Sequence, residues 1–223
     1  MKSSSKPVTA SSYVSDEYLI AIASKFSLEN YRRPSEEKDK IKIVLKEKLC
    51  GKDVIFDTGC GVGESSYLLA LENPDKVVLG VDKSVSRIER KNTFKQSLPG
   101  NLVLIQADLQ DVWPALYELQ EQGALKVCKQ YILYPNPWPK LKGVKRRWYA
   151  NPMLSFILGL NCEIEIRSNW KKYLEDFSTV VQHIAKRECA MEEFVPKGFL
   201  TPFERKYHLS SQSLYKLNIS GEK

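Results

Sequence analysis

Short apolar runs rich in valine and isoleucine alternate along the chain with segments of helix length. The runs predict five strands, over 53–57, 76–82, 101–108, 129–134 and 162–168. The segments between and after them predict helices over 66–72, 84–95, 111–122, 146–158 and 170–187. Because strand–helix alternation at this spacing is typical of βαβ units, the pattern predicts a parallel sheet with helices on both faces.

Two regions flank the alternating pattern. Two helices are expected ahead of it, over 15–26 and 35–49. After residue 190 the chain changes to short extended pieces, which predict a closing antiparallel pair near 193–196 and 213–219. The expected fold class is therefore α/β, with a Rossmann-like, mostly parallel seven-stranded sheet flanked by helices and an antiparallel C-terminal strand pair.

Length and composition favour one domain. The chain has 223 residues, of which 43% are hydrophobic, as in an ordinary globular protein. Residues 1–14 show no signal-peptide pattern and are expected to form a disordered tail. Residues 15–223 are expected to form a single domain, with N-terminal helices over 15–49 and a core over 53–223.

Several classes of protein are disfavoured by the same composition. The longest apolar stretch, 153–160, is far shorter than the roughly 20 residues that a membrane-spanning helix needs. The five cysteines form no C-x-x-C pair, so neither a metal site nor a disulfide scaffold is expected. Free cysteines fit a reducing compartment, and we expect a cytoplasmic protein, either monomer or homodimer.

The net charge of +7 is concentrated in one place. The excess cations are Lys140, Lys142, Lys145, Arg146 and Arg147. Clustered cations indicate a polyanionic partner, nucleic acid first. Charge alone leaves open a second interpretation, a solvated start of a helix.

A glycine-rich loop follows the first predicted strand. In the stretch "DTGCGVGE" (57–64), Gly59, Gly61 and Gly63 allow a tight turn and a close approach of the backbone to a ligand. Asp82 ends the second strand and is placed to accept hydrogen bonds from ribose hydroxyls. The alternative is a tight turn followed by a helix-capping acid.

The charge of this loop bears on the cofactor. Asp57 and Glu64 flank the glycines, and a carboxylate at the start of the following helix would repel a pyrophosphate. S-adenosylmethionine carries a sulfonium and an ammonium group and no phosphate, so it suits an acidic loop better than NAD does. Asp108, which ends the third strand, is placed to accept a hydrogen bond from the adenine amino group.

The most specific motifs are "YPNPWPK" (134–140), the basic stretch that ends in Lys-Arg-Arg (145–147), and "TPFERK" (201–206). With the glycine loop, they make the chain resemble the tRNA (guanine-N7)-methyltransferases over about 53–217. The resemblance implies the class I methyltransferase fold, S-adenosylmethionine as cofactor and tRNA as partner.

The resemblance also implies roles for individual residues. Cofactor binding falls on Asp57, Gly59, Gly61, Gly63, Asp82, Asp108 and Asn136. Substrate binding falls on Lys140, Asn169, Thr201, Glu204, Lys145, Arg146 and Arg147. Guanine N7 has a free lone pair, so its methylation needs orientation rather than a general base. Asn136 is therefore expected to act in catalysis by positioning the reacting groups.

Some residues depart from the family pattern. Asn136 stands where the family has an aspartate, and Ser168-Asn169 stands for its Thr-Asp. The family's histidine in the basic stretch falls on Gly143 or Val144. An Asn-Pro-Trp sequence also resembles the Asn-Pro-Pro-aromatic motif of amino-group N-methyltransferases.

Two other functions therefore stay open, an N-methyltransferase that acts on an exocyclic amino group or another small or nucleic-acid substrate, and a non-catalytic RNA-binding protein. Trp138 has two interpretations of its own, stacking on a base and filling the core.

Overall fold

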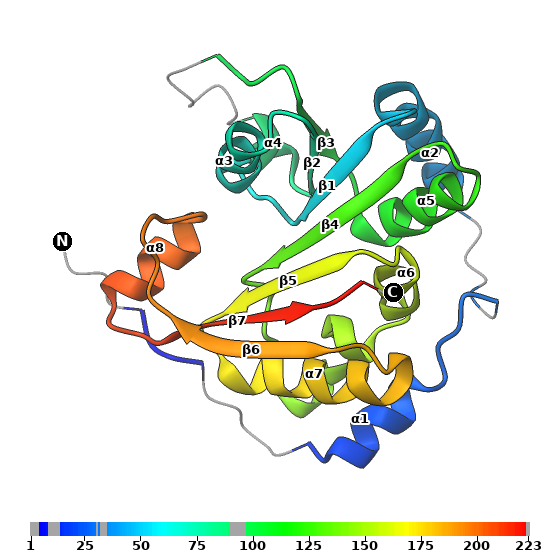
Figure 1. The fold of residues 1–223 in the computed structure, drawn as a ribbon. Helices are drawn as coiled ribbons and strands as arrows, with labels where there is room; N and C mark the ends of the chain where they lie inside the picture. The colour runs from blue at the N-terminus through cyan, green and yellow to red at the C-terminus, as the bar shows by residue number, and fades with distance from the viewer. Residues whose placement is uncertain (1–4, 9–13, 30, 32–34, 90–96, 222–223) are drawn as a thin grey trace. The chain divides into compact units, whose positions relative to one another are not determined.

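The computed structural model describes residues 5–8, 14–29, 31, 35–89 and 97–221 (Figure 1). The chain folds into two compact units. We call residues 33–133 the central unit, and residues 1–32 together with 134–223 the terminal unit.

The central unit is built on four parallel strands in the order β3-β2-β1-β4. Their bounds are β1 (Asp53–Thr58), β2 (Val77–Asp82), β3 (Leu102–Gln106) and β4 (Lys126–Leu133). The helices are α2 (Glu36–Leu49), α3 (Glu64–Glu72), α4 (Val85–Ile88) and α5 (Leu109–Glu121). Helices α2 and α5 lie side by side, and α3 packs against β2 and β3 (Figure 1).

Nearly every residue of β1 and β2 is buried, as expected for strands covered on both faces. Phe56 of β1 packs edge to face on Trp113 of α5, with ring centroids 6.1 Å apart. The Trp113 Nε1–H donates to Gln130 Oε1 over 2.9 Å, so the buried indole has its partner. This packing fixes β1, and with it the start of the glycine loop.

The terminal unit contains three strands in the order β5-β7-β6, all antiparallel. They are β5 (Glu163–Ser168), β6 (Cys189–Phe194) and β7 (Leu214–Ile219). Its helices are α1 (Asp16–Ala23), the 3-10 helices η2 (Leu141–Arg146) and η3 (Trp148–Ala150), α6 (Met153–Gly159), α7 (Lys171–Ala185) and α8 (Pro202–Leu209). Helix α7 packs along the three strands, and α1 packs on α7 (Figure 1).

The predicted fold class is confirmed. The five strands expected from apolar runs are β1 to β5, and the closing pair β6 and β7 is antiparallel. Strand β6 begins at Cys189, earlier than the predicted 193–196.

Two helix predictions need correction, and one helix was not predicted. The single helix expected over 146–158 is wrong, because Arg147 leaves the helical region with ψ 138° and Asn151 is extended ahead of Pro152. The stretch forms η2, η3 and α6 instead. The helix expected over 84–95 gives α4, which ends at Ile88, and residues 90–96 lie outside the described residues. Helix α8 was not expected at all.

The expected single domain over 15–223 stays a prediction. The expected disordered tail over 1–14 lies largely outside the described residues, although Ser5 accepts a hydrogen bond from Gln212 over 2.9 Å. In the described part of the chain, no helix is long and apolar enough to cross a bilayer. Within the same residues, no group of three or more His, Cys, Asp and Glu side chains is arranged to hold a metal ion.

Candidate functional site

The glycine loop of the central unit has an open backbone. Gly59, Gly61 and Gly63 have φ angles of 69°, 62° and 86°, in the left-handed region that favours glycine. A Cβ added at Gly59 or Gly61 would meet no atom within 4 Å, whereas at Gly63 it would lie 3.0 Å from Leu104 Cδ1. The loop therefore presents bare backbone at its first two glycines, and its third packs against Leu104 of β3.

Asp57 is fully buried at the end of β1. Its Oδ2 accepts hydrogen bonds from the Ser65 and Ser66 hydroxyls, both over 2.6 Å, which ties β1 to the first turn of α3. Its Oδ1 is buried without a partner among the described residues. Burial raises the pKa of this carboxyl to about 6, against the two serine hydroxyls, and the charge of Asp82 adds to the increase.

Asp82 connects the end of β2 to the glycine loop. Its Oδ2 accepts from the Gly61 N–H over 3.0 Å, and its Oδ1 accepts from the Ser84 N–H over 2.8 Å. Arg87 lies 3.5 Å from Oδ2. A carboxylate offers about four acceptor positions, so Asp82 keeps capacity for a further donor such as a hydroxyl.

Asp108 caps helix α5. Its Oδ1 accepts from the Gln110 N–H over 3.0 Å, and its Oδ2 pairs with Lys83 Nζ over 2.8 Å. Cys60, inside the glycine loop, is buried, and burial raises the pKa of its thiol far above the usual range. Cys60 is therefore a neutral packing residue and no nucleophile.

The "YPNPWPK" motif begins the second part of the terminal unit in a strained form. Tyr134 and Trp138 have φ angles of 51° and 43°, which non-glycine residues rarely adopt. Such residues cost about 1–3 kcal/mol each and persist only where their surroundings hold them. Tyr134 is held at both ends, because its N–H donates to the Arg167 carbonyl over 2.8 Å and its hydroxyl to Glu204 Oε2 over 3.1 Å.

Trp138 is held by a buried arginine. Arg147 is only 2% exposed, and its Nε and Nη2 donate to the Trp138 carbonyl over 3.2 and 3.0 Å. Its Nη1 donates to the Tyr149 hydroxyl over 2.8 Å and lies 3.6 Å from Asp176 Oδ2. The expected contact between Arg147 and a substrate phosphate is therefore corrected, because this guanidinium is used inside the fold.

Thr201 and Glu204 also have partners inside the unit. The Thr201 Oγ1 accepts from the Glu204 N–H over 3.0 Å and caps α8. The Glu204 carboxylate is fully buried and accepts from Arg167 Nη1 over 2.9 Å and from the Leu200 N–H over 3.2 Å, besides the Tyr134 hydroxyl. The carboxylate is thus engaged within the unit, and its expected contact with a substrate stays a prediction.

The two asparagines that replace family acids lie in different surroundings. Asn136 is exposed, and its Oδ1 lies 3.4 Å from the Trp138 N–H, which donates to it. Asn169 is half-buried, and its Nδ2 donates to Gln212 Oε1 over 2.8 Å. Asn136 thus offers its amide to solvent, whereas Asn169 is engaged within the unit.

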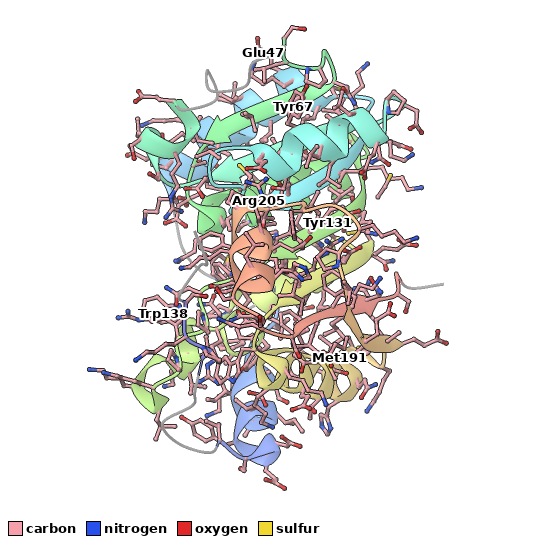
Figure 2. The ribbon with its side chains drawn as sticks, turned by 90° about the vertical axis from the view of Figure 1, so that its left-hand side faces the viewer. Glu47, Tyr67, Tyr131, Trp138, Met191 and Arg205 are labelled. Carbon is pink, nitrogen blue, oxygen red and sulfur yellow. The ribbon has the colours of Figure 1, made fainter. Side chains whose placement is uncertain are left out.

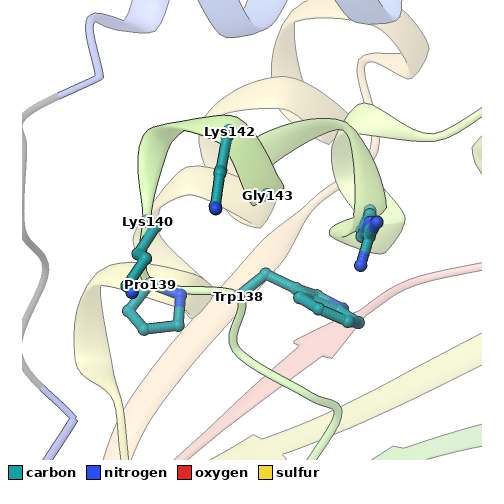
Figure 3. Close-up of a pocket in the computed structure, with 6 residues that line it drawn as sticks. Trp138, Pro139, Lys140, Lys142 and Gly143 are labelled. Atoms are coloured by element: carbon teal, nitrogen blue, oxygen red, sulfur yellow. The ribbon is translucent and has the colours of Figure 1, made fainter.

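A cavity of about 380 Å³ opens beside the motif. It is lined by Trp138, Pro139, Lys140, Lys142, Gly143 and Arg146 (Figure 3). Trp138, labelled in Figure 2, precedes η2 in the chain, and the Arg146 guanidinium lies 4.5 Å from the centre of its ring. Of the predicted substrate residues, only Lys140 and Arg146 meet here.

Besides Trp138, whose stacking role was left open, sequence reasoning missed three of the lining residues as site residues, Pro139, Lys142 and Gly143. The available signal for Lys142 and Gly143 was their place in the basic stretch directly after the prolines. Lys145 is exposed but does not line the cavity.

Comparison with known proteins gives one family match. Residues 51–217 match the family model Methyltransf_4, described as "Putative methyltransferase". The match includes both the glycine loop and the "YPNPWPK" motif.

The curated relatives are named tRNA (guanine-N(7)-)-methyltransferase. The protein from Jannaschia sp. is 31% identical over 117 residues, which are 52% of this chain and 47% of that protein. The protein from Limosilactobacillus reuteri is 26% identical over 181 residues, 73% of this chain and 78% of that protein. The protein from Actinobacillus pleuropneumoniae is 24% identical over 173 residues, 74% of this chain and 68% of that protein. The matched segment thus spans about half of the first relative, and the resemblance read from the motifs is confirmed.

Solved structures give the fold. The antibiotic-resistance methyltransferase Kmr superposes with a TM-score of 0.54 at 18% identity, over 88% of this chain and 98% of Kmr. The 16S rRNA (adenine(1408)-N(1))-methyltransferase from Catenulisporales acidiphilia gives a TM-score of 0.52 at 17% identity, over 86% and 94%. The predicted class I methyltransferase fold is thereby confirmed.

Proposed function

This chain belongs to the Methyltransf_4 family, and on that premise we propose that it transfers a methyl group from S-adenosylmethionine to N7 of guanosine in tRNA, in the cytoplasm. The observation that supports this proposal is the extent of the family match. It runs over 51–217, and so it joins a loop suited to the cofactor with the proline–tryptophan motif and its cations. The curated relatives that the chain matches are named tRNA (guanine-N(7)-)-methyltransferases.

The loop of the central unit fits the proposed cofactor. Open backbone at Gly59 and Gly61 leaves room for a ligand, and the first residue of α3 is Glu64, an acid where a phosphate ligand would need a donor. Asp82 would accept from ribose hydroxyls through its remaining lone pairs, and Asp108 would accept from the adenine amino group. The buried Asp57 would hold the loop in shape through Ser65 and Ser66, and its expected contact with the cofactor stays a prediction.

The chemistry asks little of the chain beyond placement. When bound, S-adenosylmethionine would supply an electrophilic methyl group, whose bond to sulfur would break as the bond to the N7 lone pair forms, leaving a neutral thioether and requiring no proton transfer. No general base is needed, so an asparagine at 136 is compatible with the reaction. Correct orientation of two reactants contributes as much as about 7–11 kcal/mol. Asn136 would supply part of this orientation through its exposed amide.

Some of the remaining predicted residues would contact the tRNA, and the others would hold the site in shape. Lys140, Lys145 and Arg146 are exposed cations, suited to the phosphates of tRNA. Arg147 and Glu204 are positioning residues, because each holds one end of the motif. Thr201 caps α8, and Asn169 would act after a change of partner from Gln212.

The proposal is tested by incubating the purified protein with methyl-labelled S-adenosylmethionine and bulk tRNA from cells that lack the N7 modification. Nucleosides from the digested tRNA are separated by chromatography and identified by mass. We expect N7-methylguanosine. Its cationic ring also makes the RNA sensitive to aniline cleavage at that nucleotide after borohydride reduction. Label in tRNA no higher than with heat-inactivated protein would overturn the proposal.

A second candidate is methylation of an exocyclic amino group, favoured by the exposed amide of Asn136. An amide oxygen accepts a hydrogen bond from an amino group, whereas N7 of guanine has no proton to donate. The same digest separates the two functions, since N2-methylguanosine and N6-methyladenosine are neutral and resist aniline cleavage. Finding either of these in place of N7-methylguanosine would favour the second candidate.

A further inference from the structure

We propose that the cavity lined by Trp138, Lys140, Lys142 and Arg146 binds one nucleotide of the RNA other than the methylated one, with its base on the Trp138 ring and its phosphates at the lysines. The choice of RNA as the ligand rests on the proposed function. Asn136 and Asn169, the residues expected beside the methylated base, do not line this cavity. The cavity is therefore a separate subsite within the terminal unit.

The size and the lining of the cavity fit a nucleotide. Its volume of about 380 Å³ lies within the usual range for small-ligand sites, roughly 300–1,000 Å³. One wall is the half-buried indole of Trp138, and the rim carries three cations. An aromatic face beside cations is the combination that single-stranded nucleic acid uses, the base on the ring and the backbone on the charges.

The cations of the rim are available to a ligand. Lys140, Lys142 and Arg146 are exposed, and among the described residues none of them has a carboxylate within 4.0 Å. The Lys142 side chain extends back from η2 toward Trp138 and Pro139 (Figure 3). Three unpaired cations around one cavity favour an anion with several charged oxygens, as successive phosphates provide.

The aromatic wall is fixed before any ligand arrives. Trp138 is held at φ 43° between two prolines, and its carbonyl accepts two hydrogen bonds from the buried Arg147. Gly143 leaves just enough room for it, since an added Cβ would lie 3.0 Å from Trp138 Cβ. Strain of this kind persists only where the fold imposes it, and pre-ordering a contact residue lowers the entropy cost of binding.

The ring already holds a planar partner. The Arg146 guanidinium lies 4.5 Å from the ring centre in a cation–π contact. A base that enters the cavity would extend or replace this stack, and the guanidinium keeps a phosphate within reach in either case. Trp138 is therefore a half-buried side chain that is stacked on a cation and still borders the cavity.

The test measures binding and not methylation. Full-length protein without cofactor is titrated into a fluorescently labelled, unmodified tRNA transcript, and the anisotropy gives Kd. Trp138→Ala and Trp138→Leu should weaken binding about 5- to 150-fold, the usual effect of losing one stacked base. Trp138→Phe should retain most of the affinity. The matched control is Lys197→Ala, which removes one exposed cation of the same unit away from the cavity and should leave Kd almost unchanged.

The salt dependence of RNA binding distinguishes the contact with the base from the contacts with the phosphates. The double variant Lys140→Ala/Lys142→Ala should lower the slope of log K against log salt by about 1–2, whereas the Trp138 variants should leave it unchanged. Inorganic polyphosphate is the competitor that carries charge without bases. It should displace the RNA only weakly from wild type and more readily from Trp138→Leu, because the variant binds the RNA less tightly while the inhibition constant of polyphosphate stays the same.

The outcomes distinguish this subsite from the proposed function. Wild-type affinity in Trp138→Leu, with an unchanged thermal midpoint, would overturn the subsite whatever the methylation assay gives. Failure of the wild-type protein to bind tRNA would overturn it as well. Tight binding that depends on Trp138, in a protein that forms no N7-methylguanosine, would support the subsite and reject the proposed reaction.

Discussion

Replacing Arg147 by methionine tests how much the buried Arg147–Asp176 ion pair, which holds the "YPNPWPK" motif through Trp138, contributes to stability. Methionine keeps the unbranched apolar stem of the side chain, but it removes the guanidinium and with it the donors to the Trp138 carbonyl and to the Tyr149 hydroxyl. It also removes the cation 3.6 Å from Asp176, a carboxylate that is 1% exposed. The Asp176 carboxylate would then stay buried with fewer partners, which should destabilise the folded protein.

The magnitude follows from what remains around Asp176. Breaking a buried pair by removing one member costs about 3–5 kcal/mol. Here Lys172 still lies 2.9 Å from Asp176 and the Tyr149 hydroxyl still donates to it over 2.7 Å, so we expect about 3 kcal/mol. For a chain of this length that corresponds to a fall of about 6–12 °C in Tm.

The assay is urea unfolding followed by tryptophan fluorescence, with Tm measured in parallel. The control is Arg146→Met, which removes a neighbouring but exposed cation and should change stability by less than about 0.5 kcal/mol. The double variant Arg147→Met/Asp176→Leu should recover part of the loss, because no uncompensated charge is left. A cost below about 1 kcal/mol for Arg147→Met would refute the reasoning.

Three further variants test the buried groups. Because burial raises the pKa of Asp57 to about 6, the folded chain keeps a proton that the unfolded chain loses, so stability should fall by about 3 kcal/mol as pH rises from about 4 to 6. Asp57→Asn should remove this fall, so its urea midpoint should change little between about pH 4 and 6. A dependence on pH parallel to that of wild type would contradict the assignment to Asp57. Gly80→Ala places a Cβ 2.2 Å from Ser66 Oγ and should cost about 1–3 kcal/mol in thermal unfolding, whereas an unchanged Tm would show that the contact between β2 and α3 yields freely. Glu204→Gln removes the charged acceptor of Arg167 and should cost about 1.5–3 kcal/mol in urea, so a neutral result would count against a positioning role.

The strands and the glycine loop were predictable because their signals are local. A buried parallel strand needs an unbroken apolar run, and the sequence of β1 and β2 meets that need directly. Gly59 and Gly61 follow the first such run, so their place at the strand's carboxyl end follows from chain order.

Two local errors have identifiable causes. Helix α8 was overlooked although Thr201 and Glu204 have the Thr-x-x-Glu spacing of a capping box with Pro202 at the first turn. The predicted helix over 146–158 extended apolar periodicity through Asn151-Pro152, where the backbone is extended.

The candidate site was only partly predictable because its decisive contacts are not local. Lys145, Arg146 and Arg147 look alike in sequence, yet the third is buried because Asp176, 29 positions later, and the Trp138 carbonyl receive it. No pattern of charge along the chain distinguishes a cation that faces solvent from one that faces a buried carboxylate.

The contacts of Glu204 limit how the "YPNPWPK" motif can be transferred to another protein. One carboxylate accepts from Arg167 of β5, from the Leu200 N–H just ahead of α8 and from the hydroxyl of Tyr134, which lies 70 positions earlier in the chain. A synthetic peptide with the letters "YPNPWPK" would lack these anchors and would relax out of its strained shape. The motif is thus not a portable module, and grafting it onto another scaffold requires β5 and α8 as well. Variation in acceptor preference among relatives is expected at the outward-facing Asn136, Lys140 and Lys142, while the frame beneath them stays constant.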